Sequence, residues 1–449
     1  MANYRKSNLY RILKLWINAG LHTFYRFEVH GRENLPKGKP FIITPNHENA
    51  LVDAVIAIIM MRDQPYSVAR AGAFQNPMVA KFLTRIRMFP IYRPQDGMEN
   101  MYKNEEIMRN IIQYIKDGQR ILIYPEGDQA LTRRLRPLKK GVFRMALAAE
   151  KESSWKLDLQ LVPTGVVYEE HAKMGRSVVV TYGKPICVED YYDPENFNEA
   201  RLMKVLREKL FDAMRPLMMD IPSADYNDTL EKLRLLYVPQ ALKNAGVRLS
   251  NYTQKWKYDQ SFVRAFLNEE ESNKALLETI KKQVEELNDA AARRRLRLPL
   301  FAKTNWPIVN QIGETLLLAI TLPLFVMGFL LNIIPYKVGQ GLAKKVFKHK
   351  NFEATGLFFF GLLTHSIWYW IFFILVALSS QWFIGLYFVA FMYASGKFAF
   401  LYSQRVRKWA AKWRFRYYFA KDPKEMKRLA ALRQELFSTL DSIWKPNSL

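Results

Sequence analysis

The pair His47 and Asp53 is the part of this chain best suited to acid–base chemistry. Both lie in the stretch Pro-Asn-His-Glu-Asn-Ala-Leu-Val-Asp at residues 45–53, directly after the apolar run 41–43, in a chain with only 6 histidines. A histidine takes up a proton near neutral pH, and a carboxylate on its other ring nitrogen fixes the tautomer and stabilises the imidazolium. Such a pair can activate a hydroxyl as a nucleophile. A capping histidine followed by an aspartate on a helix surface would give the same pattern, so the role of the pair depends on its neighbours.

The spacing of the pair constrains the backbone between them. Residues six apart on a regular α-helix are rotated by about 240° and separated by about 9 Å, so their side chains do not meet. We therefore expect His47 to lie in a turn before the helix. Residues 46–49 should fold back so that the ring reaches Asp53.

Further polar side chains lie where strands are expected to end. Arg93 follows the expected strand 88–92, where a guanidinium could hold a phosphate with paired hydrogen bonds. Glu126 lies in a Pro-Glu-Gly turn after the expected strand 120–124. Further candidates for residues of the site follow this turn in the sequence: Gly127, Lys139 and Lys140.

The pattern of residues 25–190 predicts the elements that position these groups. Apolar and β-branched runs alternate with helical patterns, which is typical of an α/β domain with a largely parallel or mixed sheet. Active residues should then lie at the strand ends and in the loops that follow. We expect strands at 40–44, 66–70, 88–92, 120–124, 159–167 and 177–182, and helices at 52–61, 77–85, 99–116 and 141–150.

The rest of the chain has the pattern of helices that are partly embedded in a membrane. Residues 198–297 are helical in pattern and should link the α/β part to the apolar part. Residues 354–396 contain no Asp, Glu, Lys or Arg and fit two membrane crossings joined by a polar turn at 379–381. Residues 315–334 are also uncharged, but Pro323 lies near their middle and Pro335 is expected to close the segment.

Two arrangements of residues 315–334 fit the sequence. Three full crossings would place the basic segment 337–350 on the opposite side from the arginine cluster 293–297, against the positive-inside tendency. A re-entrant or in-plane hairpin around Pro323 would place every basic flank on the cytoplasmic face. We favour the hairpin.

The net charge of the chain limits the classes of molecule that it is expected to bind. The formal net charge is +25, from 67 basic and 42 acidic residues, which suits nucleic acid, anionic lipid or phosphorylated substrates. Much of the excess positive charge, including Lys348, flanks the apolar segments, and the sequence contains no RNA- or DNA-binding motif. We therefore expect the protein to bind anionic membrane lipid and no nucleic acid.

The single cysteine, Cys187, cannot form an internal disulfide and indicates a reducing compartment. Residues 10–16 predict an amphipathic helix rather than a cleavable signal peptide.

The ordered motifs resemble those of the glycerolipid acyltransferase family, whose members acylate glycerol phosphate, glycerone phosphate and lysophosphatidate. The resemblance covers about residues 25–215, and its strength lies in the joint match of weak pieces. Segments 31–36 and 183–186 resemble those that bracket the family blocks. The four blocks are Asn46-His47 with Asp53, Phe89-Pro90 with Arg93, Pro125-Glu126-Gly127, and Pro163 in an apolar strand.

This resemblance implies a membrane-bound α/β acyltransferase that draws its acyl group from an acyl-CoA or acyl-carrier thioester, without a cofactor or metal. By position, His47 would be the general base, Asp53 its orienting partner and Arg93 the phosphate anchor. The other carried-over residues are Glu126 and Gly127, which would shape the acceptor site, Lys139 and Lys140, which are further candidates there, and Pro163, which would be structural.

The chain departs from the family pattern at three places. Five residues instead of the usual four separate His47 from Asp53, a spacing similar to that of a fungal branch acting on glycerol phosphate and glycerone phosphate. Arg87 stands where many members carry glycine, and either adds charge near the phosphate or faces solvent. After Pro-Glu-Gly the usual Thr-Arg-Ser is replaced by Asp128-Gln129-Ala130. An arginine expected there is therefore absent. One of the basic residues that follow could replace it, but we expect most of them to form a solvated face: Arg133, Arg134, Arg136, Lys139 and Lys140.

Three functions follow from these observations. We expect an O-acyltransferase of phospholipid synthesis acting on glycerol 3-phosphate or glycerone phosphate, with its catalytic domain on the cytoplasmic side of a membrane. The alternative acceptors are lysophosphatidate or another lysolipid, and a third hypothesis is a non-catalytic membrane scaffold. The expected organisation is an amphipathic N-terminal helix (1–28), an α/β acyltransferase domain with a mixed sheet (29–215), a helical linker region (216–298), C-terminal membrane-embedded helices (299–403) and a basic helical tail (404–449).

Overall fold

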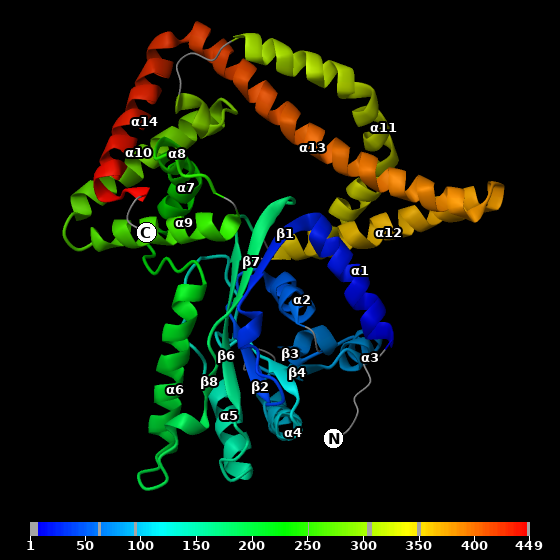
Figure 1. Cartoon of the computed structure of the whole chain (residues 1–449), viewed down its shortest axis with the longest axis vertical. Coiled ribbons are helices and arrows are strands. Elements are labelled where there is room, and N and C mark those ends of the chain that lie inside the picture. The colour runs from blue at the N-terminus through cyan, green and yellow to red at the C-terminus, as the bar shows by residue number, and fades with distance from the viewer. Residues whose placement is uncertain are drawn as a thin grey trace. The chain divides into compact units, whose positions relative to one another are not determined.

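A computed structural model describes residues 8–61, 64–93, 97–249, 251–302, 308–347 and 352–446 (Figure 1). Lys348, one of the expected lipid-facing residues, lies outside these ranges. The chain divides into two compact units. The first comprises Met1–Pro222 with Phe347–Phe358, and the second comprises Ser223–Val346 with Phe359–Leu449.

The first unit is built on one mixed sheet of mostly parallel strands in the order β1-β7-β6-β2-β5-β3-β4, with β8 paired to β6. Only the β6–β7 and β6–β8 pairs are antiparallel. The expected α/β fold with a mixed sheet is therefore confirmed. The strands are β1 (Tyr25–His30), β2 (Phe41–Pro45), β3 (Tyr66–Arg70), β4 (Met88–Ile91), β5 (Arg120–Leu122), β6 (Gln160–Tyr168), β7 (Arg176–Tyr182) and β8 (Ile186–Cys187).

The helices of this unit alternate with the parallel strands, as expected. They are α1 (Asn8–Phe24), α2 (Ala50–Met60), α3 (Pro77–Arg85), α4 (Lys103–Lys116), α5 (Gly141–Glu152) and α6 (Glu199–Met214). Strand β3 and helix α3 have the predicted bounds. Strand β1 was not predicted, although its residues alternate apolar and polar side chains, the pattern of a half-buried strand. Helix α2 begins at Ala50 rather than at residue 52, and α4 begins at Lys103 rather than at residue 99.

Burial explains why β2 and β6 form a rigid platform. Every residue of both strands is buried, as expected for strands covered on both faces. The two strands are parallel, with Pro45 opposite Thr164. The turn after β2 and the residues at the end of β6 therefore lie at the same edge of the sheet.

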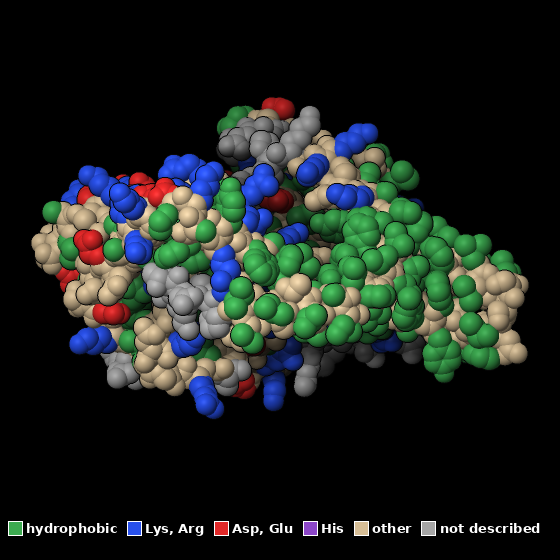
Figure 2. Space-filling model, turned by 90° about the horizontal axis from the view of Figure 1, so that it is seen from above, with side chains coloured by type: hydrophobic (Ala, Val, Ile, Leu, Met, Phe, Trp, Pro, Cys, Tyr) green, Lys and Arg blue, Asp and Glu red, His purple; other side chains and the backbone are tan. Residues whose placement is uncertain are grey.

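The second unit consists of helices. They are α7 (Asn227–Leu236), α8 (Val238–Asn244), α9 (Tyr252–Asn268), α10 (Lys274–Arg293), α11 (Ile308–Val346), most of α12 (Glu353–Ser379), α13 (Trp382–Lys421) and α14 (Pro423–Ile443). Helices α11, α12 and α13 are long and apolar enough to cross a membrane by length and composition. Figure 2 shows a broad hydrophobic surface on this part of the molecule. Strongly exposed apolar side chains of these helices include Ile320, Leu378 and Tyr387. The expected turn at 379–381 is confirmed, since α12 ends at Ser379 and α13 begins at Trp382.

The expected end at Pro335 and the expected hairpin around Pro323 are wrong. Helix α11 runs through both prolines to Val346. A proline cannot donate to the carbonyl four residues earlier, which for Pro335 is that of Leu331. The Trp368 indole N–H donates to this carbonyl at 2.9 Å and replaces the missing donor, so the helix continues.

A polar junction joins these three apolar helices. The Asn332 side chain of α11 donates to the Met392 carbonyl of α13 at 3.1 Å and accepts from the Tyr369 hydroxyl of α12 at 2.8 Å. A Cβ on Gly396 would lie 2.8 Å from the Asn332 amide, so the glycine permits this close approach.

We predict that Gly165→Ala destabilises the first unit by about 1–3 kcal/mol, because overpacking a filled core costs that much. A Cβ at Gly165 in β6 would lie 1.9 Å from the Leu217 carbonyl oxygen. Gly141→Ala is the matched control, since a Cβ there meets nothing within 4 Å. Thermal unfolding of the full chain in detergent measures both variants, and equal midpoints would contradict this packing.

Candidate active site

Asn46 fixes the turn that carries His47. Its side chain forms two hydrogen bonds with Val166 of β6: the amide donates to the Val166 carbonyl at 3.1 Å, and the amide oxygen accepts from the Val166 N–H at 2.7 Å. Because β6 is fully buried, this bridge holds the start of the turn against a rigid strand.

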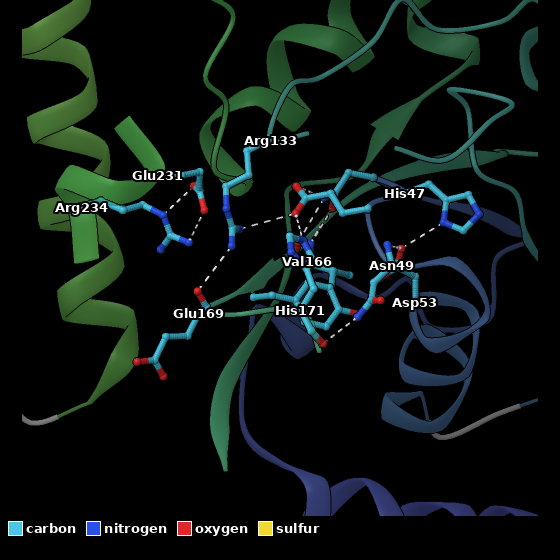
Figure 3. Close-up of polar contacts among 12 residues, drawn as sticks. His47, Asn49, Asp53, Arg133, Val166, Glu169, His171, Glu231 and Arg234 are labelled. Atoms are coloured by element: carbon cyan, nitrogen blue, oxygen red, sulfur yellow. Dashed lines mark hydrogen bonds and ion pairs between the residues drawn. The ribbon is translucent and has the colours of Figure 1, made fainter. Parts of the chain in front are cut away.

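The predicted approach of His47 to Asp53 is confirmed (Figure 3). His47 Nδ1 lies 3.0 Å from Asp53 Oδ2, across residues 46–49, which precede α2 and are folded back as expected. Asp53 is fully buried, and it also accepts from the Asn49 N–H at 2.6 Å and from the Tyr168 hydroxyl at 2.5 Å. A carboxylate oxygen accepts, so Nδ1 carries the proton and Nε2 has a free lone pair. The ring is held in the tautomer that a general base requires.

The extra residue between His47 and Asp53 is accommodated by backbone strain. Ala50 has φ +48°, in the left-handed region that residues other than glycine rarely adopt. It is also buried and begins α2. This residue joins the turn that carries His47 to the helix that carries Asp53.

Glu126 and Arg136 hold the backbone of His47 on both sides, and we call them the His47 clamp. The buried Glu126 carboxylate accepts from the His47 N–H at 2.9 Å and from Arg136 Nε at 2.7 Å. Arg136 Nη2 donates to the His47 carbonyl at 3.2 Å. Burial raises the pKa of Glu126 above its usual range, although the Arg136 guanidinium and the two backbone N–H groups oppose the shift. Glu126 therefore contacts the His47 turn rather than open space.

Tyr124 packs on the His47 ring from the end of β5. The two rings are stacked, with centroids 4.0 Å apart and planes 22° apart. Burial raises the pKa of the Tyr124 hydroxyl well above its usual value, so that it stays protonated. The stacking fixes the plane of the imidazole, and the hydrogen bond to Asp53 fixes its rotation.

Arg93 lies beside the Pro-Glu-Gly turn. Its guanidinium donates to the Gly127 carbonyl, and Nη1 lies 3.5 Å from Asp128 Oδ1. Arg70, at the end of β3, also forms an ion pair with Asp128. The turn itself requires glycine, because Gly127 has φ +71°.

The two candidate lysines differ in what they contact. The Lys139 side chain packs over Gly127, since a Cβ on that glycine would lie 2.9 Å from Lys139 Cγ. The Lys139 N–H also donates to the Pro125 carbonyl at 2.7 Å. Lys140 is exposed immediately before α5. Lys139 is thus part of the turn, whereas Lys140 lies only near it.

The expectation that Arg133 and Arg136 are solvated is wrong. Arg133 is almost fully buried, with Nη1 3.5 Å from Glu48 Oε2 and Nη2 donating to the Glu169 carbonyl at 3.5 Å (Figure 3). Arg136 belongs to the His47 clamp, and only Arg134 is exposed. The buried Arg133 and the partly exposed Arg136 both neutralise buried carboxylates, a need that the local sequence does not reveal.

Arg87 fits neither of its two expected roles. Its guanidinium donates to the Gln64 carbonyl at 3.1 Å and lies 4.9 Å from the centre of the Tyr66 ring. It therefore stabilises the packing around β3 rather than facing the phosphate or the solvent.

Sequence reasoning missed the polar group behind the turn. Glu48 is buried and accepts from the Asn46 amide at 3.1 Å, and its other oxygen lies 3.0 Å from His171 Nε2. Tyr168 and His171 lie at and just beyond the end of β6. The parallel pairing of β6 with β2 would have indicated them, because the ends of parallel strands share one edge. In the described part of the chain, no group of three or more His, Cys, Asp or Glu side chains could hold a metal ion.

We predict that Arg136→Ala destabilises the protein by about 2–3 kcal/mol at neutral pH, because it leaves the buried Glu126 carboxylate without its cationic partner. The loss should shrink as the pH falls toward 4. Without Arg136, the pKa of Glu126 in the folded protein rises further above its value in the unfolded chain. A raised carboxyl pKa destabilises the folded state only at pH values at which the unfolded carboxyl group is ionised, so the loss disappears in acid.

Denaturant unfolding at pH of about 4 and about 7, values on either side of an ordinary glutamate pKa, measures this difference. Arg134→Ala is the control, since Arg134 is exposed. A loss that is equal at both pH values would contradict the role assigned to Arg136.

Part of the chain is similar in sequence to known acyltransferases. Residues 26–167 match the family model described as Acyltransferase. A chloroplastic 1-acyl-sn-glycerol-3-phosphate acyltransferase, BAT2 of Brassica napus, is 26% identical over 145 residues, which are 32% of this chain and 40% of that protein. The 1-acyl-sn-glycerol-3-phosphate acyltransferase of Bacillus subtilis is 27% identical over 119 residues, 26% of this chain and 55% of that protein.

Two further relatives extend the comparison. Glycerol-3-phosphate O-acyltransferase 2 of Saccharomyces cerevisiae is 28% identical over 141 residues, 30% of this chain and 18% of that protein. The crystal structure of the 1-acyl-sn-glycerophosphate acyltransferase PlsC from Thermotoga maritima is similar with a TM-score of 0.34 and 16% identity, over 47% of this chain and 83% of that chain. The chain spans less than two thirds of the length of the curated relatives it matches.

Proposed function

We propose that this protein, whose residues 26–167 match the family model described as Acyltransferase, moves an acyl group from a thioester to a hydroxyl of a phosphorylated glycerol at a membrane. The observation that carries the proposal is the His47–Asp53 contact of 3.0 Å, which leaves Nε2 of a partly exposed ring able to accept a proton. The donor would be acyl-CoA or an acyl-carrier protein, used as a co-substrate.

The reaction would proceed in one displacement at the thioester. His47 Nε2 removes the proton from the acceptor hydroxyl as the hydroxyl oxygen attacks the thioester carbonyl carbon. The C–S bond then breaks, the ester forms, and the departing thiolate takes the proton from the imidazolium. Asp53 stabilises the imidazolium while the proton resides there, and backbone N–H groups of the turn would stabilise the oxyanion. No acyl-enzyme is needed.

Arg93 would bind the phosphate of the acceptor. It lies beside the Pro-Glu-Gly turn, and Glu126 of that turn is hydrogen bonded to the His47 backbone. A phosphate held there would fix the hydroxyl near the base and turn an encounter into an oriented reaction. In this proposal Glu126 acts by holding His47, Gly127 shapes the turn, and Lys139 and Lys140 add positive charge nearby.

Two acceptors compete within this proposal. The spacing of five residues between His47 and Asp53 favours glycerol 3-phosphate or glycerone phosphate. The names of the relatives from Brassica napus and Bacillus subtilis favour 1-acylglycerol 3-phosphate instead. Both acceptors present a phosphomonoester and a free hydroxyl, so the same residues would serve either. A scaffold without activity has no use for a histidine held in a defined tautomer.

We predict that purified protein in detergent transfers labelled acyl groups from acyl-CoA to glycerol 3-phosphate, and that Asp53→Asn lowers the rate by about 10²–10⁴-fold, because the tautomer and the imidazolium lose their support. His47→Ala is the blank, and Asp117→Asn, at an exposed aspartate after α4, is the matched control.

Parallel assays with glycerone phosphate and lysophosphatidate identify the acceptor. Product with lysophosphatidate alone would select the second acceptor. Normal transfer by folded His47→Ala protein would refute the mechanism, and no product with any acceptor would favour the scaffold.

We also propose that the catalytic domain lies on the cytoplasmic side. Basic residues flank the apolar helices, and the positive-inside tendency and anionic headgroups favour such flanks on the cytoplasmic face. The basic flank on the side of the α/β unit is the arginine cluster 293–297, since no candidate span lies between it and that unit in the described part of the chain.

The native Cys187 provides the measurement, because it is the single cysteine and is partly exposed in β8. We predict that a membrane-impermeant maleimide labels Cys187 only after cells are permeabilised. Cys187→Ser protein gives the background. Equal labelling of intact and permeabilised cells would place the domain outside.

A further inference from the structure

Two arginines from neighbouring strands converge on one carboxylate beside the candidate active site. Arg70 ends β3, Arg93 follows β4, and the two parallel strands are paired with Arg70 opposite Ile91. Both guanidinium groups form ion pairs with Asp128, which directly follows the Pro-Glu-Gly turn. We call Arg70 and Arg93 the arginine pair.

The donors meet at a single oxygen of Asp128. Arg70 Nη2, Arg93 Nη1 and the Gln129 N–H all point to Oδ1, the last two at 3.5 and 2.8 Å. Partial desolvation would raise the pKa of Asp128, but the Gln129 N–H and the two arginines lower it below its usual value. Asp128 is therefore negative at neutral pH, and the donors around it form an anion position.

This anion position lies close to the His47 turn. Arg136 donates both to the Asp128 carbonyl and to the His47 carbonyl. The Ala130 N–H also donates to the His47 carbonyl, at 3.3 Å. Residues 128–136 therefore contact both the anion position and the backbone of His47, the proposed base. An anion bound in place of the Asp128 carboxylate would lie next to this segment.

We propose that the Asp128 carboxylate is an internal anion that occupies the arginine pair until the phosphate of the acceptor displaces it, with Arg70 as a second phosphate ligand beside Arg93. The inference rests on the proposed function and goes beyond it by naming a competitor within the chain. A phosphomonoester carries nearly two negative charges and three acceptor oxygens, whereas the Asp128 carboxylate carries one charge. The phosphate should therefore displace Asp128 from the arginine pair. An uncharged acceptor offers nothing to the arginines and leaves Asp128 in place.

The competing explanation is an ordinary surface ion pair. The side chains of Arg70 and Asp128 are 50% and 58% exposed, and exposed pairs contribute little to stability. The two explanations differ in what removal of the Asp128 charge does to phosphate binding. A surface pair predicts no specific effect, whereas a competitor predicts tighter binding.

The test measures binding of glycerol 3-phosphate and inorganic phosphate to the full chain in detergent by calorimetry. Asp128→Asn keeps the size of the side chain and the acceptor for Gln129, and should tighten both ligands by about 3–10-fold. Arg70→Gln should weaken both by about 10-fold or more. In the Arg70→Gln background, Asp128→Asn should change binding by less than about 2-fold, because the competition has lost one arginine.

Glu152→Gln is the matched control. Glu152 forms an exposed ion pair with Lys116 at 3.0 Å, within the first unit and away from the arginine pair. Its removal changes the net charge by the same amount and should leave phosphate binding unchanged. The inference is overturned if Asp128→Asn binds phosphate no better than wild type, if Glu152→Gln gives the same gain, or if the gain persists in Arg70→Gln protein.

The calorimetric readout separates this inference from the proposed function. Tighter phosphate binding by Asp128→Asn in a protein that acylates no acceptor would support the anion position and refute the enzyme. Transfer that depends on His47, together with unchanged phosphate binding by Asp128→Asn, would refute the internal anion alone.

Discussion

A buried carboxylate needs hydrogen-bond donors, and Asp53 obtains all of its donors from the segments that must meet to form the site. One donor is the His47 ring, one is the backbone of Asn49 in the turn, and one is the Tyr168 hydroxyl at the end of β6. An ionised carboxyl group without such donors would be too costly to bury. The same three bonds therefore satisfy Asp53, close the turn and attach it to the sheet.

The turn is surrounded by buried acidic groups, each with its own cation or donor. Glu126 has Arg136, and Glu48 has His171 and Arg133. Glu48 lies 123 residues from His171, and Glu126 and Arg136, although neighbours in sequence, contact the His47 backbone across 79 and 89 residues. The His47 turn is therefore fixed by distant parts of the chain rather than by its own residues alone. The left-handed conformation of Ala50 persists because these contacts over-determine it.

The fold and the central pair could be predicted from the sequence because their signals are local. Apolar runs identified β2, β3 and β6, and helix spacing showed that His47 must fold back toward Asp53. Strand β1 was not predicted, although its alternation of apolar and polar residues is also a local signal. His171 was missed because its partner Glu48 lies 123 residues away. The role of Arg136 was missed because a basic residue in a loop looks solvated until the carboxylate that it neutralises is known. Pro335 was wrongly expected to end its helix for a similar reason. The donor that satisfies the carbonyl four residues earlier is the Trp368 indole on another helix, which local sequence does not indicate.

The bond from Trp368 to the Leu331 carbonyl has a consequence for how the chain is built. Helix α11 precedes α12 in the sequence, so it is synthesised before the indole that completes its backbone hydrogen bonding exists. During synthesis the helix has an unsatisfied carbonyl one turn before Pro335, a local weak point in an apolar surrounding. The backbone hydrogen bonding of α11 around Pro335 is thus completed only when α12 packs against it. Its continuity is a property of the assembled helices rather than of its own residues.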